Sequence, residues 1–393
     1  MELIDSNCVR REICVLRNGT TSGVYYDVKN LVSHPKQLTE VGDKMYSLLA
    51  RHYPDCNLLC GVPIGGLPFC TYLSTQFDIP MIMARMTTKD YGLKKCIEGE
   101  HSKKCKCVII EDVVTSGASI NEVYNLLKDK VDVLGAITVL DRQENHKCKI
   151  EVRSVYYKND ITKLRLWNTI ERKGRLCFAG DIEEPVRLLQ ILNQIGSKIC
   201  ICKVHVDIMN FSECSRADFI RMLLEAAIKY DFLIMEDRKF VDISSVVERQ
   251  YKYLKDWADL VTVHGSVKDE VLSVLSGAMF VANMSNGGME RITEDYTSKA
   301  RRLMQSHDKN LAGFITQHRI NGLVCMMPGI NISKMFDKEQ NYQKPPDASK
   351  TDVIIVGRGI YEADNIMKAV ESYTEKTPNP PSRNNYIMDF SKK

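Results

Sequence analysis

Residues 107–119 read CVIIEDVVTSGAS, an apolar run that ends in two carboxylates and a turn of small residues. The near-continuous apolar character of 108–114 predicts a parallel strand that is buried on both faces. The small residues can turn without steric conflict and present backbone N–H groups at the start of a helix over about 120–128. Those donors and the helix dipole favour a phosphate dianion, so the stretch predicts a sugar-phosphate cradle at a strand end. The turn consists of Thr115, Ser116, Gly117, Ala118 and Ser119.

Two carboxylates, Glu111 and Asp112, stand near the carboxyl end of the same predicted strand. Carboxylates at this position can accept hydrogen bonds from vicinal ribose hydroxyls or lie near a metal ion bound to the substrate. The alternative is that both are solvated side chains before an ordinary helix N-cap. The segment resembles the 5-phosphoribosyl 1-diphosphate (PRPP) binding signature of type I phosphoribosyltransferases, which favours the ribose-binding role.

A second signature of different chemistry lies downstream, where residues 232–242 read FLIMEDRKFVD. An apolar strand ends in an alternating array of acid, base and acid, which indicates either a catalytic site or a solvated helix start. Lys203 belongs to another apolar strand and Asp181 ends a third, so charges gather at several strand ends. Because barrel enzymes build their sites from charges that converge at the carboxyl ends of parallel strands, the catalytic interpretation is favoured. The array consists of Asp237, Lys239 and Asp242.

Length and composition agree with two sites in one chain. The 393 residues, 44% of them hydrophobic, predict two or three domains with sizeable cores. The net charge of +4 is small and the basic residues are scattered, which argues against nucleic acid as a partner and for small phosphate ligands. The 14 cysteines occur without an N-terminal apolar leader or finger spacing, which indicates a reducing compartment, the cytoplasm, and no cysteine-bound metal. No apolar run reaches membrane-spanning length.

The first part of the chain, 1–155, is predicted to be one domain. Its strands are predicted over 24–28, 57–62, 80–85, 108–114 and 134–140, and its helices over 35–51 and 67–77. This alternation is typical of a doubly wound α/β sheet. The polar stretch between Arg85 and Lys106 has no period and is interpreted as a mobile active-site loop without regular elements.

The second part, 174–377, predicts a longer series of alternating strands and helices. Strands are predicted over 176–181, 199–206, 232–236, 260–264, 278–284, 311–316, 323–327 and 353–356. Eight strands separated by helices predict a TIM (β/α)8 barrel. Residues 156–173 are interpreted as a linker helix that packs on the barrel, and 378–393 as a flexible, proline-containing tail.

In this order, the two signatures resemble the bifunctional UMP synthase family, an orotate phosphoribosyltransferase fused ahead of an orotidine 5′-phosphate decarboxylase. The resemblance covers nearly all of 15–375. It implies a type I phosphoribosyltransferase sheet ahead of a barrel, and synthesis of UMP from orotate and PRPP through orotidine 5′-phosphate. It further implies Mg²⁺ bound through PRPP in the transfer step, no cofactor for decarboxylation, and a homodimer whose active sites are shared between subunits.

In the transferase half, the resemblance gives roles to individual positions. Residues 60–67 match the pyrophosphate loop. Arg85 precedes the mobile loop, and Arg142 matches an arginine that contacts orotate, whose carboxylate a guanidinium can bind through two hydrogen bonds. Lys89 on the closing loop is expected to neutralise charge that develops on departing pyrophosphate, and Asp112 is expected to be catalytic.

In the decarboxylase half, the resemblance assigns the charged set to catalysis and substrate binding. Lys239 is expected to stabilise the electron density left at pyrimidine C6 and to deliver the proton there. Asp237 and Asp242 hold that lysine charged and crowd the substrate carboxylate, with Asp242 supplied by the partner subunit. Lys203 is expected to be catalytic and Asp181 to bind substrate. The other expected substrate contacts are Ser285, Pro328, Gln340, Tyr342, Gly357 and Arg358.

Four positions depart from the family pattern. Arg17 stands where a lysine near orotate and PRPP is usual, and Met86 replaces a basic residue of the loop. In the barrel, Ala179 replaces a serine, and Val246 replaces a threonine whose hydroxyl reaches the ribose. Two alternatives to a fully bifunctional enzyme therefore remain: a decarboxylase with a weakened transferase half, and a nucleotide-binding scaffold without catalysis.

Overall fold

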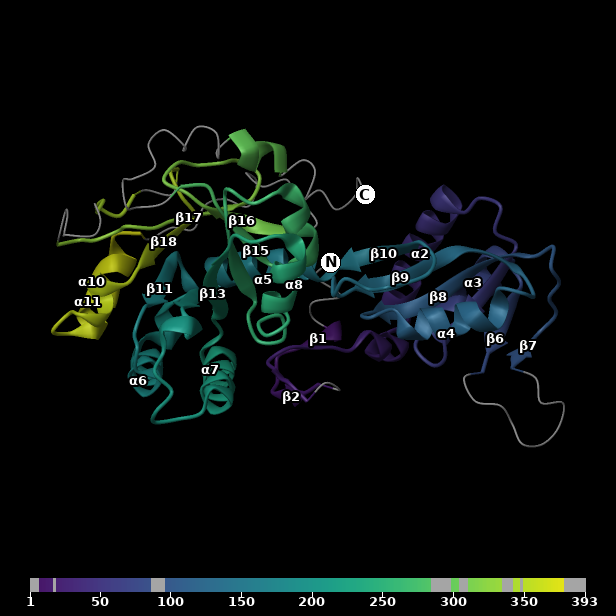
Figure 1. Cartoon of the computed structure of the whole chain (residues 1–393), viewed down its shortest axis with the longest axis horizontal. Helices are drawn as coiled ribbons and strands as arrows, with labels where there is room; N and C mark the ends of the chain where they lie inside the picture. Colours follow the sequence, from purple (N-terminus) through teal and green to yellow (C-terminus); the bar gives the residue numbers. More distant parts are fainter. Residues whose placement is uncertain are drawn as a thin grey trace. The chain divides into compact units, whose positions relative to one another are not determined.

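Figure 1 shows the computed structural model of the chain, which describes residues 7–16, 19–85, 96–283, 298–303, 310–333, 342–346 and 349–377. The chain forms two compact units. The first comprises Met1–Arg10 and Tyr26–Ile161, and the second comprises Arg11–Tyr25 and Thr162–Lys393. The second unit is therefore assembled from two separate segments of the chain.

The first unit is built on a six-stranded sheet with the strand order β10-β9-β8-β5-β6-β7. Neighbouring strands are parallel except β6 and β7, which are antiparallel. The strands are β5 (Leu58–Gly61), β6 (Met81–Ala84), β7 (Ile97–Glu98), β8 (Lys106–Val114), β9 (Asp132–Asp141) and β10 (Val152–Tyr157). The other elements are β1 (Val9–Arg10), β4 (Tyr25–Tyr26), the 3-10 helix η1 (Val28–Ser33), α2 (Pro35–His52), α3 (Leu67–Phe77) and α4 (Ala118–Leu127).

Helices pack on both faces of this sheet. Met45 and Leu49 recur at helical spacing on α2 and share an apolar core with Ile110 of β8. Val123 of α4 shares a second core with Ile109 of the same strand. Because successive residues of a strand point to opposite faces, these two cores lie on opposite sides of the sheet. The predicted doubly wound fold is confirmed.

Three short elements of the first unit differ from the prediction. The strand expected over 24–28 is shorter, since β4 ends at Tyr26 and η1 begins at Val28. The polar stretch after Arg85 does contain a regular element, because Ile97 of β7 is buried and pairs with Ala84 of β6. Strand β10 was not predicted because it crosses the domain boundary expected at residue 155 and lies at the sheet edge, where apolar and polar residues mix.

The second unit contains a closed barrel of parallel strands in the order β11 to β18. They are β11 (Leu176–Gly180), β12 (Ile201–Val204), β13 (Leu233–Phe240), β14 (Leu260–His264), β15 (Ala278–Val281), β16 (Leu311–Ile315), β17 (Val324–Met327) and β18 (Val353–Val356). The described helices include α5 (Lys158–Lys173), α6 (Pro185–Ile195), η2 (Gly196–Lys198), η3 (Val206–Ile208), α7 (Arg216–Tyr230), α8 (Ser244–Tyr251), η4 (Asp269–Val274), α10 (Arg358–Tyr361) and α11 (Ile366–Glu375). Each predicted strand is present, and the predicted (β/α)8 barrel is confirmed.

Helix α5 closes one end of the barrel. Its Leu166, Trp167 and Ile170 are fully buried and belong to the core inside the barrel, which includes inward-facing side chains of the strands. Arg165 Nη1 lies 3.1 Å from Oδ1 of Asp259, the residue just before β14. The helix therefore covers the amino-terminal ends of the strands, and the carboxyl ends are left for a site.

Residues 11–25, which the sequence places in the first domain, contact the barrel unit instead. They contain β2 (Cys14–Val15) and β3 (Thr21–Ser22), an antiparallel pair. Arg11 Nη1 lies 2.7 Å from Asp231 Oδ1, and Arg11 Nη2 donates to the carbonyl oxygens of Ala227 and Phe232. This segment, the N-terminal strap, therefore holds the turn between α7 and β13. Sequence periodicity gives no signal for such a contact between distant segments.

We expect Trp167→Ala to destabilise the barrel unit by about 3–5 kcal/mol, because it removes a fully buried indole and leaves a cavity. Chemical denaturation followed by circular dichroism measures the loss. Lys173→Ala at the end of the same helix, where the ammonium makes a long 3.4 Å contact with Ser197 O, should change stability by less than about 0.5 kcal/mol. Equal effects of the two substitutions would contradict the role of α5 as the barrel closure.

Candidate active sites

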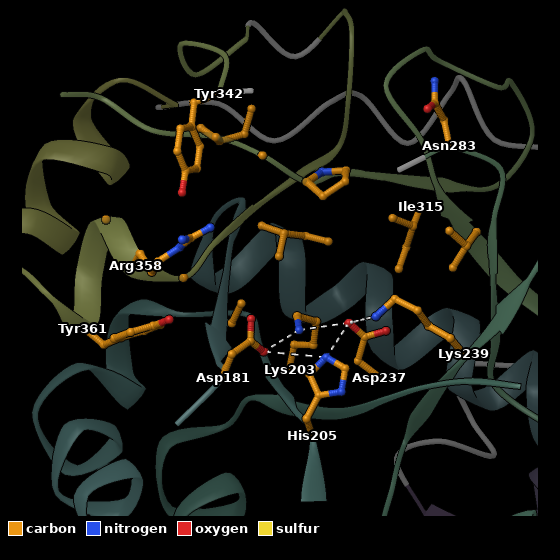
Figure 2. A pocket seen from close by; sticks show the side chains of 18 residues that line it. Asp181, Lys203, His205, Asp237, Lys239, Asn283, Ile315, Tyr342, Arg358 and Tyr361 are labelled. Carbon is orange, nitrogen blue, oxygen red and sulfur yellow. Dashed lines mark hydrogen bonds and ion pairs between the residues drawn. The ribbon is translucent and has the colours of Figure 1, made fainter. Parts of the chain in front are cut away.

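A cavity of about 260 Å³ opens at the carboxyl ends of the barrel strands (Figure 2). Charged and polar side chains line one part of it, and apolar side chains line the rest. The lining residues are Ala179, Asp181, Lys203, His205, Asp237, Lys239, Val281, Asn283, Ile315, Pro328, Gly329, Ile330, Tyr342, Ile355, Gly357, Arg358, Gly359 and Tyr361. Of the expected barrel residues, Asp181, Lys203, Asp237, Lys239, Pro328, Tyr342, Gly357 and Arg358 are thus brought together.

Carboxylates and ammonium groups alternate along the polar side of the cavity. Lys203 Nζ lies 2.7 Å from Asp181 Oδ1 and 2.9 Å from Asp237 Oδ2. Lys239 Nζ lies 2.9 Å from the same Asp237 oxygen. The order acid, base, acid, base lets each buried charge face an opposite one, which a desolvated charge requires.

Burial and charge act in opposite directions on the pKa values of this array. Burial alone would lower the pKa of Lys203, but the carboxylates of Asp237 and Asp181 raise it above its usual range. Burial alone would raise the pKa of Asp237, but Lys203, His205 and Lys239 hold it well below its usual range. Lys203 and Asp237 are therefore both charged at neutral pH.

The backbone at Lys239 is shaped to present its side chain. Lys239 has a positive φ of 49°, which is uncommon for a residue with a side chain. Its N–H donates to Thr262 Oγ1 at 2.8 Å, and that hydroxyl donates to Asp237 Oδ1 at 2.8 Å. Strand β13 continues to Phe240 and does not end at 236 as predicted. Its pairing with β14 is irregular between Glu236 and Phe240. The bulge places Asp237 and Lys239 where one threonine holds both.

The polar residues of this site that were not predicted from the sequence include Asn283, Tyr361, His205 and Thr262. His205 Nε2 lies 3.1 Å from Asp237 Oδ2, and His205 lines the cavity. It follows Lys203 by two positions, and the twofold period of a strand, which puts both on one face, was the available signal. Thr262 is a single hydroxyl inside the apolar strand β14, and its polarity in a fully buried position was the only hint.

Asp242 lies apart from the other members of the predicted array. Its side chain is exposed, it does not line the cavity, and its Oδ1 accepts a hydrogen bond from Ile243 N at 2.7 Å. Val241 and Ile243 on either side of it are 63% and 66% exposed. The structure therefore does not bring Asp242 to Lys239 of the same chain. Ser285 and Gln340 lie outside the described residues.

The acidic pair of the first unit is buried at the end of β8. Asp112 Oδ2 lies 2.7 Å from Lys29 Nζ. Burial and the neighbouring Asp112 carboxylate raise the pKa of Glu111 to about 9, so Glu111 is protonated at neutral pH. A Cβ on Gly65 would stand 2.2 Å from Asp112 Cγ, which shows how closely the segment 60–67 approaches the acidic pair. The segment 60–67 and the acidic pair of β8 therefore lie side by side.

The turn after β8 has the conformation that a phosphate loop needs. Gly117 has φ +80°, which glycine adopts without strain, and α4 begins at Ala118. The neighbouring segment holds the turn in place, since Lys147 N donates to Ser116 O at 3.1 Å. Thr115 and Ser119 flank it in sequence, and phosphate binding by the backbone N–H groups of this turn stays a prediction.

The two predicted arginines of this unit make ion pairs with nearby carboxylates. Arg142 Nη2 lies 2.9 Å from Glu144 Oε1, and its guanidinium lies over the Tyr26 ring. Arg85 Nη2 lies 3.1 Å from Glu98 Oε1. Lys89 lies outside the described residues, as do Arg17 and Met86. The arginine contacts with orotate stay predictions.

No arrangement of three or more His, Cys, Asp or Glu side chains suited to a metal ion is found in the described part of the chain. No helix within the described ranges is long and apolar enough to cross a bilayer.

A buried carboxyl, Glu236, supports the barrel site from behind. It precedes Asp237 on β13, and its two carboxyl oxygens lie 3.2 and 3.3 Å from Val206 N. Burial raises the pKa of Glu236 to about 8, and the neighbouring carboxylates Asp207 and Asp237 add to this. Glu236 thus fixes the backbone directly after His205.

Comparison with known proteins finds a family match for each of the two parts of the chain. Residues 174–373 match the Orotidine 5'-phosphate decarboxylase / HUMPS family, and residues 27–167 match the Phosphoribosyl transferase domain. Uridine 5'-monophosphate synthase of Bos taurus is 29% identical over 444 residues, which cover 91% of this chain and 92% of the bovine protein. The protein of that name from Naegleria gruberi is 26% identical, with 95% and 94% covered. Orotidine 5'-phosphate decarboxylase of Pichia kudriavzevii is 35% identical over 215 residues, 49% of this chain and 81% of that protein.

The raised pKa of Glu236 predicts a pH-dependent stability. The protonated side chain stabilises the fold fully below about 4.5, its ordinary pKa, and this contribution is lost as the pH rises through about 8. Glu236→Gln keeps an acceptor for Val206 N and cannot ionise, so its unfolding free energy should fall less between about pH 5 and 8, by on the order of a few kcal/mol. Urea denaturation across this range measures it. The exposed Glu225→Gln is the control and should follow the parent; a parental profile for Glu236→Gln would contradict the assignment.

Proposed function

Because this chain belongs to the orotidine 5′-phosphate decarboxylase / HUMPS family and also carries a phosphoribosyl transferase domain, we propose that it catalyses the last two steps of UMP synthesis. Orotate and PRPP give orotidine 5′-phosphate and pyrophosphate, and decarboxylation then gives UMP and CO₂. The observation that carries this proposal is the alternating array of Asp181, Lys203, Asp237 and Lys239 in the barrel cavity.

The array supplies what decarboxylation without a cofactor demands. Loss of CO₂ leaves an electron pair at pyrimidine C6, and the ammonium of Lys239 stabilises it and then transfers a proton to that carbon. Asp237 pairs with this ammonium at 2.9 Å and, being ionised, crowds the substrate carboxylate. Lys203 balances the charge of Asp237 from the other side. Thr262 keeps the pair in position before substrate arrives, which favours the transition state over the ground state.

A homodimer with shared sites accounts for Asp242. This carboxylate is exposed between two exposed apolar side chains, Val241 and Ile243, and it does not reach the cavity of its own chain. Exposed apolar side chains beside a site indicate a contact surface. We therefore assign Asp242 of one subunit to the cavity of the other, where it faces Lys239.

The remaining cavity residues bind different parts of the nucleotide. Arg358 and the glycine that precedes it, Gly357, take the phosphate, and Tyr342 lies beside that arginine, 5.8 Å from guanidinium carbon to ring centre. Asp181 and His205 accept or donate hydrogen bonds at the ribose hydroxyls. Ser285 at the pyrimidine and Gln340 at the phosphate remain predictions.

In the transferase unit, the backbone of 115–119 binds the 5-phosphate of PRPP, and the acidic pair binds the ribose hydroxyls. Asp112 carries the negative charge there, because Glu111 is protonated. Lys29, which pairs with Asp112, gives way to the ribose. Arg142 and Arg85 bind orotate and PRPP, and Lys89 neutralises the leaving pyrophosphate.

Magnesium fits this unit only through its substrate. The described residues of this unit form no cluster of three or more His, Cys, Asp or Glu side chains suited to a metal ion, and Mg²⁺ favours phosphate oxygens and water. The ion would be held by PRPP beside Asp112 and would supply charge neutralisation for the pyrophosphate.

Lys239→Ala should abolish decarboxylation and leave the transfer step intact, since it removes the ammonium that is assigned to stabilise and protonate C6. Purified protein with orotate, PRPP and Mg²⁺ should accumulate orotidine 5′-phosphate, and the decarboxylation kcat should fall about a thousandfold or more. Chromatography of the products measures both steps separately. Lys252→Ala, an exposed lysine away from the cavity, is the control and should behave as the parent. UMP formation by Lys239→Ala at the parental rate would contradict the assignment of Lys239 to decarboxylation.

Asp112→Asn should affect the transfer step alone. It keeps the shape of the side chain and removes the charge that supports the ribose as pyrophosphate departs, so the transferase kcat should fall about a hundredfold. Decarboxylation of added orotidine 5′-phosphate should stay unchanged. Asp55→Asn, which loses a surface pair with Lys106, is the matched control. A variant that kept transfer and lost decarboxylation would show that the two activities are assigned to the wrong units.

A further inference from the structure

Tyr361 is a residue of the barrel cavity to which the roles above give no part. It ends α10, the short helix that begins with Arg358 directly after β18. Residues at this spacing lie on the same side of a helical turn, so the two side chains reach the same region. The main chain at Tyr361 is anchored, because its carbonyl oxygen accepts a hydrogen bond from Arg187 Nη2 at 3.3 Å. The phenol is thus held at the cavity by a fixed backbone.

The phenol points into the cavity between a cation and a carboxylate. In Figure 2 its hydroxyl is directed toward the space between Arg358 and Asp181, on the opposite side of the cavity from Lys239. The ring runs alongside Gly357, since its Cε1 is 3.5 Å from the place a Cβ on that glycine would take. Within the described part of the chain, the Tyr361 hydroxyl makes no hydrogen bond. A half-buried donor at this position is available to a ligand.

The phenol of Tyr361 is protonated at neutral pH and can therefore donate a hydrogen bond. Burial and the neighbouring carboxylate of Asp181 raise the pKa of Tyr361 to about 12, so the hydroxyl keeps its proton at neutral pH. Arg358 offers donors only. Two donor groups that face one space are complementary to an oxyanion, and a phosphate carries several acceptor oxygens.

We propose that the Tyr361 hydroxyl is a further specificity-determining contact of the barrel, which donates a hydrogen bond to a phosphate oxygen of the bound nucleotide beside Arg358. This rests on the proposed function, which places a nucleoside monophosphate in the cavity. The phosphate is remote from C6 and does not change in the reaction, so the hydrogen bond is the same in the ground state and the transition state. It therefore lowers KM and separates nucleotides from nucleosides without contributing to kcat.

Tyr361→Phe tests the contact, because it removes the hydroxyl and keeps the ring that packs on Gly357. Inhibition of decarboxylation by UMP and by uridine, together with KM and kcat for orotidine 5′-phosphate, is measured on the full chain. The inhibition constant of UMP and the KM should each rise about tenfold, as expected for a lost hydrogen bond to a charged group, with kcat and the uridine constant unchanged. Tyr230→Phe is the matched control, since that hydroxyl contacts Asn193 on the outside of the barrel.

Two results would overturn the proposal. An equal loss of UMP and uridine affinity would show that the hydroxyl contacts the nucleoside or only shapes the cavity, and unchanged constants for both would show that it contacts neither. Unfolding temperatures of the Tyr361→Phe and Tyr230→Phe variants show whether each is folded. The proposed function is tested separately. If the parent chain does not decarboxylate orotidine 5′-phosphate, the proposed function is contradicted. If the parent is active and the Tyr361→Phe variant binds UMP as tightly as the parent, only the Tyr361 contact is contradicted.

Discussion

Asp237 pairs with two lysines through one oxygen, and the arrangement of the barrel site depends on this carboxylate. Its Oδ2 lies 2.9 Å from the Nζ of both Lys203 and Lys239, and its Oδ1 accepts from Thr262. Removal of one partner from such a buried pair costs roughly 3–5 kcal/mol, because an uncompensated charge is left behind. The partners come from the neighbouring strands β12, β13 and β14, so Asp237 gains them when these three strands pair. Strand pairing and the charge pattern of the cavity therefore depend on each other.

Contacts that stabilise the barrel lie at the amino-terminal ends of its strands, whereas the cavity opens at their carboxyl ends. At the amino-terminal ends of the strands, α5 fills the interior with Trp167 and its apolar neighbours, and Arg165 pairs with Asp259. Asp259 also accepts a hydrogen bond from Ile234 N at the start of β13, and the N-terminal strap holds the turn before that strand through Arg11. Strand β13 is thus fixed at its beginning. Its other end is free to depart from regular pairing, and that irregularity presents Lys239.

The sequence by itself predicted the two folds, their order along the chain and most of the charged residues of the acidic pair and the barrel cavity. Apolar runs of strand length with charged residues at their ends mark both the turn after β8 and the array on β13, because charged groups at the carboxyl end of a buried strand indicate a site. This local signal was enough for Glu111, Asp112, Lys203 and Asp237. Local signals were weaker for β7 and β10, whose short or edge positions leave few buried residues to produce a period.

Tertiary structure alone decided which further side chains join the site and which leave it. His205 and Tyr361 line the cavity, and Thr262 of β14 holds Asp237 and Lys239 of β13. These contacts join segments that are separate in sequence, and a pattern within one segment does not contain them. Asp242 belongs to the same charged motif as Lys239, yet the bulge and the turn that follow carry it to the surface. The N-terminal strap likewise joins the barrel through contacts of high sequence separation. Short-range periodicity predicts which residues are buried, whereas contacts between residues that are distant in sequence depend on how the strands pair in the folded barrel.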